Sequence, residues 1–235
     1  MQKSTIAEIR ERFDNDVERF SNLDTGQVAT IDAQVSLELI TEAAKRIIPA
    51  ARNVLDVGCG AGNYTLKMLS KLPDLNCTLV DLSKPMLDRA HQRVSAATKG
   101  FVNVLQGDIR EVPLDENSFD IILAGAVLHH LRDNNDWESC FKKLFALLRP
   151  GGCLMIADLV IQDFPALNAY TWERYGDYLK SVGGEEYKNK VLAYVEKEDS
   201  PQSVTFQLDL MKRVGFRQVD ILHKNICFAA FGGVK

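Results

Sequence analysis

The stretch LDVGCGAGNYT, residues 55–65, decides the fold class of this chain. An apolar, strand-like run leads straight into Gly58, Gly60 and Gly62, and a helical pattern begins near Asn63. Glycine has no Cβ, so the backbone can turn tightly there and a ligand can approach it closely. The N-terminus of the following helix offers unpaired N–H groups and the positive end of a dipole. The stretch predicts a strand–turn–helix unit suited to a ligand, although a tight turn without a ligand would read the same way.

Working outward from this stretch, short apolar runs alternate with helical patterns between Val54 and about Gly152. The strand candidates cover residues 53–57, 77–80, 102–106, 119–124 and 153–159. Their near-continuous apolar character is typical of strands that are buried on both faces by crossover helices. The alternation predicts βαβ units and an open parallel sheet with right-handed connections.

The residues before and after this core show sequence patterns different from its strand–helix alternation. Two helices are predicted before the core, over about 4–21 and 32–48. After the core we predict two helices over 163–199 with a break at Gly183-Gly184, a helix over 203–215, and a final pair of strands joined through Asn225. In the helix over 32–48, apolar residues at four-residue spacing from Val35 to Ile47 predict the buried stripe. We therefore predict one domain over residues 1–235, with an N-terminal helical cover (1–48) and a helical lid insertion (163–199).

Composition limits the classes of function. Of 235 residues, 46% are apolar and 26% charged, and the net charge is −4, so the chain is an ordinary globular protein and an unlikely partner for nucleic acid. Five cysteines without CxxC spacing argue against a disulfide framework and a zinc knuckle, and favour a reducing compartment. The charged N-terminus lacks the apolar run of a signal peptide, and no stretch reaches the roughly 18 apolar residues of a membrane span. We expect a cytoplasmic protein that does not bind membranes.

A second signal comes from Asp81, which ends the next predicted strand 23 residues after Gly58. An acid at this place can accept hydrogen bonds from both hydroxyls of a ribose. Dinucleotide sites carry GxGxxG, whereas this chain carries GxGxG. The spacing therefore favours another ribose-containing cofactor over a nicotinamide or flavin.

Two later stretches fit the same cofactor. QGDIRE places Asp108 after the third strand, where its carboxylate can accept from an adenine amine while the Ile109 N–H faces a ring nitrogen. FDIILAG ends the fourth strand in Ala124 and Gly125, small residues that leave room for a ligand. Each stretch alone could be a plain turn, but their order and separation are specific.

Taken together, these motifs resemble the class I S-adenosylmethionine-dependent methyltransferases over about residues 53–235. The resemblance implies an α/β, Rossmann-like, seven-stranded sheet, mostly parallel with a reversed last strand, in the order 3-2-1-4-5-7-6 with helices on both faces. It implies S-adenosylmethionine as cofactor, a small-molecule methyl acceptor and no metal. The residues it assigns to the cofactor are Asp56, Gly58, Cys59, Gly60, Gly62, Asp81, Leu82, Met86, Asp108, Ile109, Ala124 and Gly125.

A narrower resemblance points to a different reaction. The helical N-terminus, the insertion and the ending KRVGFRQVDILHKNICFAAFGG are similar to the branch that makes carboxy-S-adenosylmethionine for tRNA wobble-uridine modification. That activity implies an arginine in the insertion, but between Asp177 and Asp199 this chain has only lysines as cations. Lysine does not replace arginine at a bidentate carboxylate site. This branch and a catalytically silent cofactor-binding protein stay as alternatives to a methyltransferase.

Two adjacent histidines follow the fourth strand, where the methyl group of the cofactor is expected. Neighbours on a helix diverge by about 100°, so His129 and His130 are not expected to address one atom or to share a metal ion. We expect His129 near the site as a candidate general base and His130 in a structural role; the alternative is that both pack or cap. Methyl transfer itself depends mainly on alignment, so no base is obligatory.

The predicted lid is rich in aromatic residues. Its aromatic residues are Phe164, Tyr170, Trp172, Tyr175, Tyr178, Tyr187 and Tyr194. This cluster could line an acceptor pocket or serve as ordinary helix packing. Phe13 and Phe20 lie seven residues apart on one face, which suits docking of the N-terminal cover onto the lid. The sequence leaves the acceptor and the oligomeric state open, a homodimer included.

Overall fold

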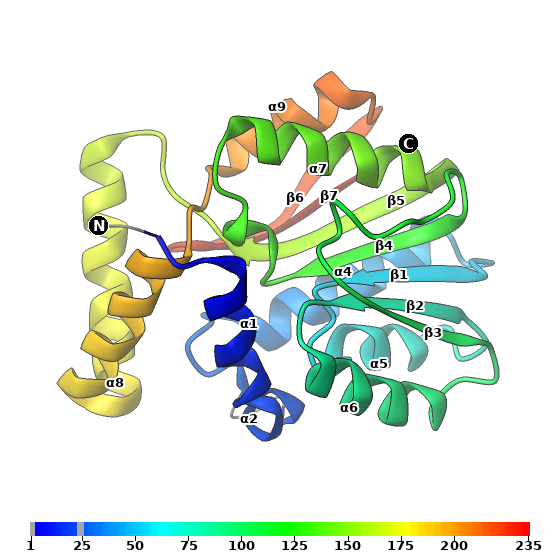
Figure 1. The fold of residues 1–235 in the computed structure, drawn as a ribbon. Coiled ribbons are helices and arrows are strands. Elements are labelled where there is room, and N and C mark those ends of the chain that lie inside the picture. The colour runs from blue at the N-terminus through cyan, green and yellow to red at the C-terminus, as the bar shows by residue number, and fades with distance from the viewer. Residues whose placement is uncertain (1–2, 23–25) are drawn as a thin grey trace.

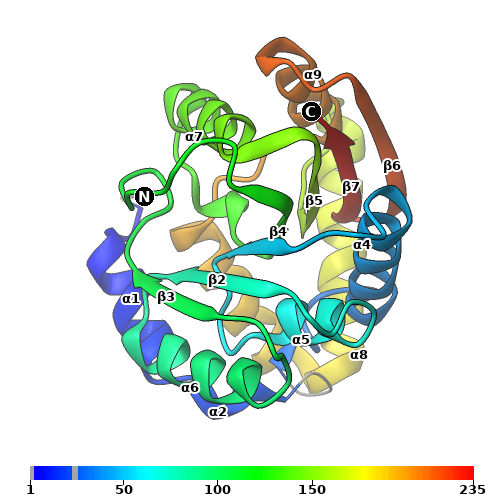
Figure 2. The same cartoon turned by 90° about the vertical axis from the view of Figure 1, so that its right-hand side faces the viewer.

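The computed structural model describes residues 3–22 and 26–235 and is built around one seven-stranded sheet (Figures 1 and 2). The strands are β1 (Asn53–Val57), β2 (Asn76–Asp81), β3 (Val102–Gln106), β4 (Phe119–Gly125), β5 (Leu148–Leu159), β6 (Gln218–Asn225) and β7 (Phe228–Val234). Their order is β3-β2-β1-β4-β5-β7-β6. Neighbours among β1–β5 are parallel, whereas β7 is antiparallel to both β5 and β6. The predicted sheet order and the reversed last strand are confirmed.

Helices cover both faces of the sheet. They are α1 (Ile6–Asp14), α2 (Val17–Ser21), α4 (Ala33–Ile47), α5 (Asn63–Leu69), α6 (Lys84–Ser95), α7 (Asn134–Leu147), α8 (Pro165–Glu198) and α9 (Val204–Val214), with a 3₁₀ turn η1 (Leu128–His130). Helices α4, α5 and α6 pack on one face, and α7 and α9 pack on the other (Figure 2). Helix α8 stands at one end of the molecule, with α1 and α2 between it and α6 (Figure 1).

The central strand β4 shows why this sequence forms a two-sided sheet. Side chains alternate between the faces of a strand. Ile121 and Leu123 belong to the core beneath α4 and α5, whereas Ile122 and Ala124 belong to the core beneath α7 and α9. All four are fully buried. Each large side chain contributes roughly 1.5–3 kcal/mol of transfer free energy, which stabilises the stacking of both helical layers on the sheet.

The N-terminal cover differs from the prediction in one respect, because the expected helix over 4–21 is divided into α1 and α2. Helix α1 begins at a capping box in which the Thr5 hydroxyl accepts from the Glu8 N–H and the Glu8 carboxylate accepts from the Thr5 N–H. It ends at Asn15, whose side-chain amide donates to the Glu11 carbonyl. Asparagine and aspartate bond to nearby backbone groups and so favour helix ends.

The predicted buried stripe of α4 was wrong. Val35 and Ile47, the two ends of that stripe, are 47% and 42% exposed, and the buried apolar positions include Leu37, Ile40 and Ala44. A spacing of four residues overshoots the 3.6-residue turn by about 40° at each step. Over three steps the predicted stripe winds away from the face that packs on the sheet.

Helix α8 contains the predicted break, with Gly183 and Gly184 outside helical geometry. Its aromatic face packs on the N-terminal cover: the Tyr175 hydroxyl donates to the Ala29 carbonyl at 3.0 Å and the Tyr178 hydroxyl to the Val28 carbonyl at 2.8 Å. This packing is one of the two readings that the sequence left open for the aromatic cluster.

The C-terminal hairpin forms as predicted, but its turn lies one residue later. Asn225 still pairs with Phe228 at the end of β6, and the turn consists of Ile226, with a φ of 52°, and Cys227. Within residues 3–22 and 26–235, no helix is long and apolar enough to cross a membrane.

Candidate active site

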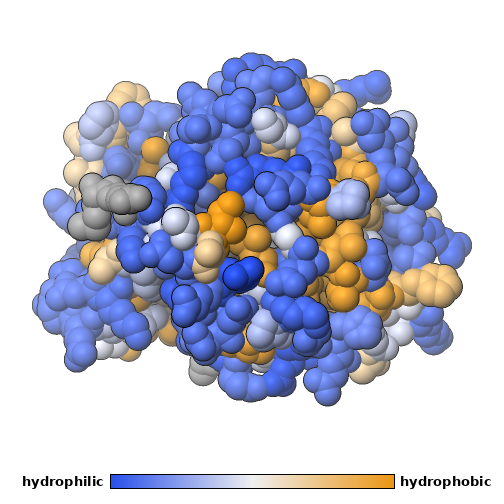
Figure 3. Space-filling model, in the orientation of Figure 1, coloured by the Kyte–Doolittle hydropathy of each residue, from blue (hydrophilic) through white to orange (hydrophobic). Residues whose placement is uncertain are grey.

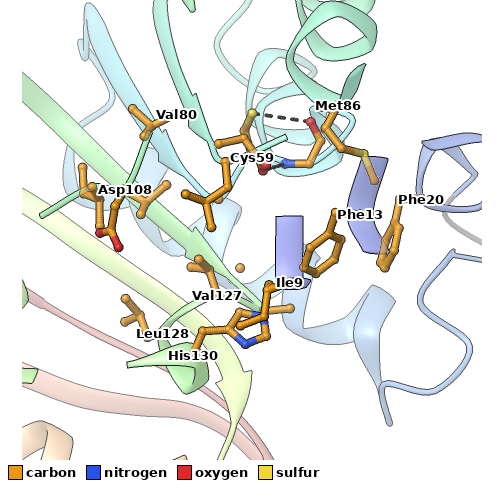
Figure 4. A pocket seen from close by; sticks show the side chains of 18 of the residues that line it. Ile9, Phe13, Phe20, Cys59, Val80, Met86, Asp108, Val127, Leu128 and His130 are labelled. Atoms are coloured by element: carbon orange, nitrogen blue, oxygen red, sulfur yellow. Dashed lines mark hydrogen bonds between the residues drawn. The ribbon is translucent and has the colours of Figure 1, made fainter. Parts of the chain in front are cut away.

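A cavity of about 440 Å³ opens at the carboxyl ends of the central strands (Figure 4). In open α/β sheets, ligands bind at this edge, where the strand order changes direction. Asp108 lies on one side of the cavity, and Phe13 and Phe20 of the N-terminal cover lie on the other (Figure 4). Apolar side chains, orange in Figure 3, gather in the middle of the face that carries α1, amid mostly hydrophilic surroundings. The cavity therefore joins a polar half at the strand ends to an apolar half under the cover.

Most of the residues expected to bind a cofactor line this cavity. They are Gly58, Cys59, Gly60, Asp81, Leu82, Met86, Asp108, Ile109 and Gly125. Four candidates stand behind its walls, namely Asp56, Gly62, Ala124 and His129. The sequence thus located the strand ends correctly but did not separate lining residues from those that support them.

The glycine turn after β1 brings backbone to the surface of the cavity. Gly58 and Gly60 have φ values of 64° and 50°, in the left-handed region that favours glycine. A Cβ at Gly58 would lie 2.4 Å from Cγ2 of Val127, so the turn and the segment after β4 fit together only with glycine there. A Cβ at Gly60 would meet no atom within 4 Å of it among the described residues. Gly60 therefore leaves an open approach to the backbone.

Asp81 ends β2 with its carboxylate held toward this turn. Oδ2 accepts from the Gly60 N–H and Oδ1 from the Ser83 N–H, both at 2.8 Å. Burial raises the pKa of Asp81, while these backbone N–H groups oppose that shift. A carboxylate has about four acceptor positions, so each oxygen retains capacity for a hydroxyl of a bound ligand. The arrangement suits a vicinal diol.

Asp108 lines the cavity and belongs to a row of three charged side chains, with Arg110 between Asp108 and Asp136. Its Oδ1 accepts from Nε of Arg110 at 3.0 Å and its Oδ2 from Nη2 at 2.6 Å, while Nη1 of Arg110 lies 2.5 Å from Oδ1 of Asp136. Burial acts to raise the pKa of Asp108, but the hydrogen bonds and charge of Arg110 outweigh it and keep that pKa below its usual value. The carboxylate is therefore ionised at neutral pH and available as an acceptor.

Three of the candidates behind the cavity walls support the site through packing or hydrogen bonds. Oδ2 of Asp56 accepts from the Thr65 hydroxyl at 2.6 Å and from the Thr65 N–H at 3.2 Å, which ties β1 to the first turn of α5. Burial raises the pKa of Asp56 to about 7. A Cβ at Gly62 would come within 3.1 Å of Val94, so this glycine allows α5 to approach α6. Ala124 belongs to the core beneath α7.

The structure reverses the expected placement of the two histidines. His130 lines the cavity, beside Ile9 (Figure 4), whereas His129 stands behind the wall with Nδ1 against Oδ1 of Asp158. Burial acts to lower the pKa of His129, but the carboxylates of Asp158 and Asp199 outweigh it and raise that pKa to about 9. This raised pKa, together with its place behind the wall, disfavours His129 as the base that the sequence suggested. Burial and the charge of His129 lower the pKa of His130.

The helical parts contribute unequally to the cavity. Among the described residues, those lining it include Ile9, Phe13 and Phe20 from the cover but none from the range 163–199. The predicted lid is thus a neighbour of the cover and not a wall of the cavity. Phe13 and Phe20 dock on each other, with ring centroids 5.5 Å apart, and face the cavity where the sequence predicted docking onto the lid. Their seven-residue spacing indicated a shared face but not what that face meets.

Comparison with known proteins agrees with this geometry. Residues 54–152, from β1 to the start of β5, match the family model described as a methyltransferase domain. The chain contains a class I S-adenosylmethionine-dependent methyltransferase domain. S-adenosylmethionine is its cofactor, and the open backbone at Gly60 and the free acceptor positions of Asp81 fit the methionine and ribose parts of that molecule.

The similarity to individual relatives extends beyond residues 54–152. The chain is 25% identical to the carboxy-S-adenosyl-L-methionine synthase of Vibrio atlanticus over 82% of this chain and 80% of that enzyme. It is 28% identical to the demethylmenaquinone methyltransferase of Listeria monocytogenes, over 63% of this chain and 61% of the enzyme, so it spans less than two thirds of that relative. The structure of a SAM-dependent methyltransferase from Thermotoga maritima superposes with a TM-score of 0.61 at 22% identity, covering 98% and 99% of the two chains. The alignment with this structure therefore spans nearly the whole of both chains.

Proposed function

We propose that this methyltransferase transfers the methyl group to a small acceptor with an apolar or aromatic body. The observation that carries the proposal is the continuous cavity from the strand ends to Ile9, Phe13 and Phe20. Aromatic and aliphatic walls with a few polar groups are typical of small-molecule sites, and the volume lies in the usual range of roughly 300–1,000 Å³. A polymer would need an open groove, whereas the N-terminal cover closes this side of the cavity.

The residues divide the work between binding and alignment. In this proposal Asp81 accepts from the ribose hydroxyls, Asp108 and the Ile109 N–H face the adenine, and the Gly58–Gly60 turn receives the methionine part. The cofactor supplies an activated methyl group, and transfer is an in-line displacement at its carbon. The chain aligns the acceptor atom with that bond and keeps water away, which accounts for most of the acceleration in such reactions. No base at His129 is required, because methyl transfer depends mainly on the alignment of the acceptor atom with the bond that breaks.

A panel of acceptors tests this proposal. Purified protein is incubated with methyl-labelled cofactor and with apolar phenols, quinols and amines, alongside short RNA and peptide substrates as polymer controls. We expect label transfer to members of the small apolar group. Transfer only to RNA or peptide would refute the proposed acceptor class while leaving the methyltransferase assignment intact.

A second function has its own support. The similarity to the carboxy-S-adenosyl-L-methionine synthase covers four fifths of each chain. Arg132 also lines the cavity, and its guanidinium donates to the carbonyls of Glu198 and Ser4; among the residues described, no carboxylate side chain pairs with it. Its charge is thus available to a carboxylate on the cofactor, in place of the arginine that the stretch between Asp177 and Asp199 lacks. Native mass spectrometry distinguishes the two functions, since a bound cofactor heavier by the mass of carbon dioxide supports the second.

A further inference from the structure

Three side chains from separate parts of the chain converge behind the cavity wall. His129 and His130 belong to η1, which follows β4, and Asp199 follows the last residue of α8. Nδ1 of His130 lies 3.2 Å from Oδ1 of Asp199, and Nε2 of His129 lies 3.7 Å from the same oxygen. One ligand atom from each residue falls within 4.8 Å of the others. The sequence predicted that adjacent histidines would diverge, but in the short 3₁₀ turn their ring centroids are only 4.3 Å apart.

The converging atoms lack ordinary partners. Nδ1 of His130 and Oδ1 of Asp199 are buried and, within the described part of the chain, neither makes a hydrogen bond of acceptable geometry, in spite of their short separation. The Asp199 side chain is only 5% exposed. Buried polar atoms almost always make well-formed hydrogen bonds, so two such atoms that lie 3.2 Å apart without one are open to a third participant.

Nδ1 of His129, the ring nitrogen that does not face Asp199, contacts a carboxylate, as the non-ligating nitrogen of a metal-binding histidine usually does. Nδ1 of His129 contacts the Asp158 carboxylate, which is fully buried at the end of β5. Asp158 is itself fixed, because Oδ2 accepts from the Leu128 N–H at 2.8 Å and Oδ1 from the Leu159 N–H at 2.7 Å. A carboxylate of this kind orients the ring and directs Nε2 toward the ion.

We propose that His129 Nε2, His130 Nδ1 and Asp199 Oδ1 together bind one divalent transition-metal ion of the zinc type. Zinc takes imidazole nitrogen and carboxylate oxygen at about 2.0–2.2 Å, which places tetrahedral ligand atoms about 3.4 Å from one another. The two distances to Asp199 bracket that value. Two imidazoles with one carboxylate are a ligand set suited to zinc, iron or nickel and unsuited to calcium or magnesium.

The charge around the three ligands is compatible with a cation. Metal binding displaces the proton of the His129 ring nitrogen, and the resulting neutral imidazoles with the Asp158 and Asp199 carboxylates balance a doubly charged ion. The nearest cationic side chains contact other atoms than the three ligand atoms: Arg12 pairs with Glu198 at 2.6 Å, Arg132 donates to the Glu198 and Ser4 carbonyls, and Lys3 donates to the backbone carbonyls of Glu196 and Asp199. Because His130 also lines the cavity, the ion would lie at the cavity wall and join η1 to the segment after α8.

Metal titration tests the proposal without relying on enzymatic activity. Chelator-treated full-length protein is titrated with Zn²⁺ by calorimetry and with Co²⁺ by visible absorption at about pH 8, because ligand protons are released on binding. We expect one equivalent to bind, a Co²⁺ spectrum of four-coordinate type and a higher melting temperature with metal. Asp199→Asn and His130→Gln should each weaken binding by at least about tenfold, as losses around metal ligands usually do.

The control is a histidine–carboxylate pair elsewhere in the chain. Nε2 of His223 lies 2.8 Å from Oδ2 of Asp32, outside the cavity and the proposed site. His223→Gln should therefore bind Zn²⁺ as the wild type does. Absence of stoichiometric binding to the wild type, or equal binding by Asp199→Asn, His130→Gln and wild type, would overturn the proposal. If both site variants fail to fold, X-ray absorption of the Zn²⁺-loaded wild type decides, since a first shell without imidazole also overturns it.

Discussion

Replacing Asp81 by asparagine tests the central assignment of the cofactor site. The change keeps the size of the side chain but removes its charge and turns one acceptor oxygen into a donor. Oδ1 and Oδ2 each accept from a backbone N–H at 2.8 Å, so one of these bonds and one bond to the ligand diol are lost together. A hydrogen bond to a charged group contributes about 1.5–3 kcal/mol, which corresponds to roughly 10- to 150-fold weaker cofactor binding.

Calorimetry with the demethylated product of the cofactor measures this loss directly. Asp120→Asn is the matched control, because Oδ2 of Asp120 also accepts from two backbone N–H groups, of Arg52 and Asn53, both at 2.8 Å. Asp120 lies near the amino end of β4, whereas the cavity lies at the carboxyl ends of the strands. We expect the control to lower the melting temperature without changing cofactor affinity.

A ligand lacking one ribose hydroxyl separates direct contact from support of the glycine turn. Wild type should bind this analogue less tightly than the parent, whereas Asp81→Asn should discriminate less between the two. A coupling free energy near zero would show that Asp81 only holds the Gly60 N–H. Wild-type affinity in Asp81→Asn would refute the assignment altogether.

Three further changes test other parts of the site. Gly125→Ala would place a Cβ 2.4 Å from the Tyr64 ring and should destabilise the fold by about 1–3 kcal/mol in urea denaturation; unchanged stability would contradict the packing described. Phe13→Ala removes a ring from the far wall and should raise KM for the acceptor more than it lowers kcat or cofactor affinity, as steady-state kinetics would show. Asp56 has its pKa raised to about 7 by burial, so the folded state holds more protons than the unfolded state between about pH 4 and 7 and loses stability as pH rises through that range. The stability of Asp56→Asn relative to wild type should therefore increase from about pH 5 to about pH 8, and a constant difference would argue against the shift.

The polar half of the site could be predicted from the sequence because the end of a strand is marked by residues close to it in the sequence. Glycines after an apolar run and an acid at the next strand end are short-range signals, and parallel strands bring such residues to one edge of the sheet. The same signals could not distinguish Gly60, which borders the cavity, from Gly62, which supports helix packing. That distinction depends on the approach of α6.

The apolar half could not be predicted because it depends on tertiary docking. Phe13 and Phe20 share a face in the sequence, but only the position of α1 and α2 over the strand ends turns that face toward the cavity. The two histidines were misplaced for a similar reason, since the prediction assumed an α-helix after β4 where the chain forms a 3₁₀ turn anchored by Asp158. No pattern around residue 129 signals a carboxylate some thirty residues later.

The position of β7 has a consequence for the synthesis of the protein. Although it is the last strand in the chain, β7 lies between β5 and β6 and pairs with both along most of its length. A nascent chain that ends before Phe228 leaves β5 without a neighbour on one side and β6 with no strand to join. Exposed strand edges are templates for aggregation, and long-range pairing is slow. Termination or cleavage of the chain before Phe228 is therefore expected to yield insoluble chains, even though every residue that lines the cavity precedes that point.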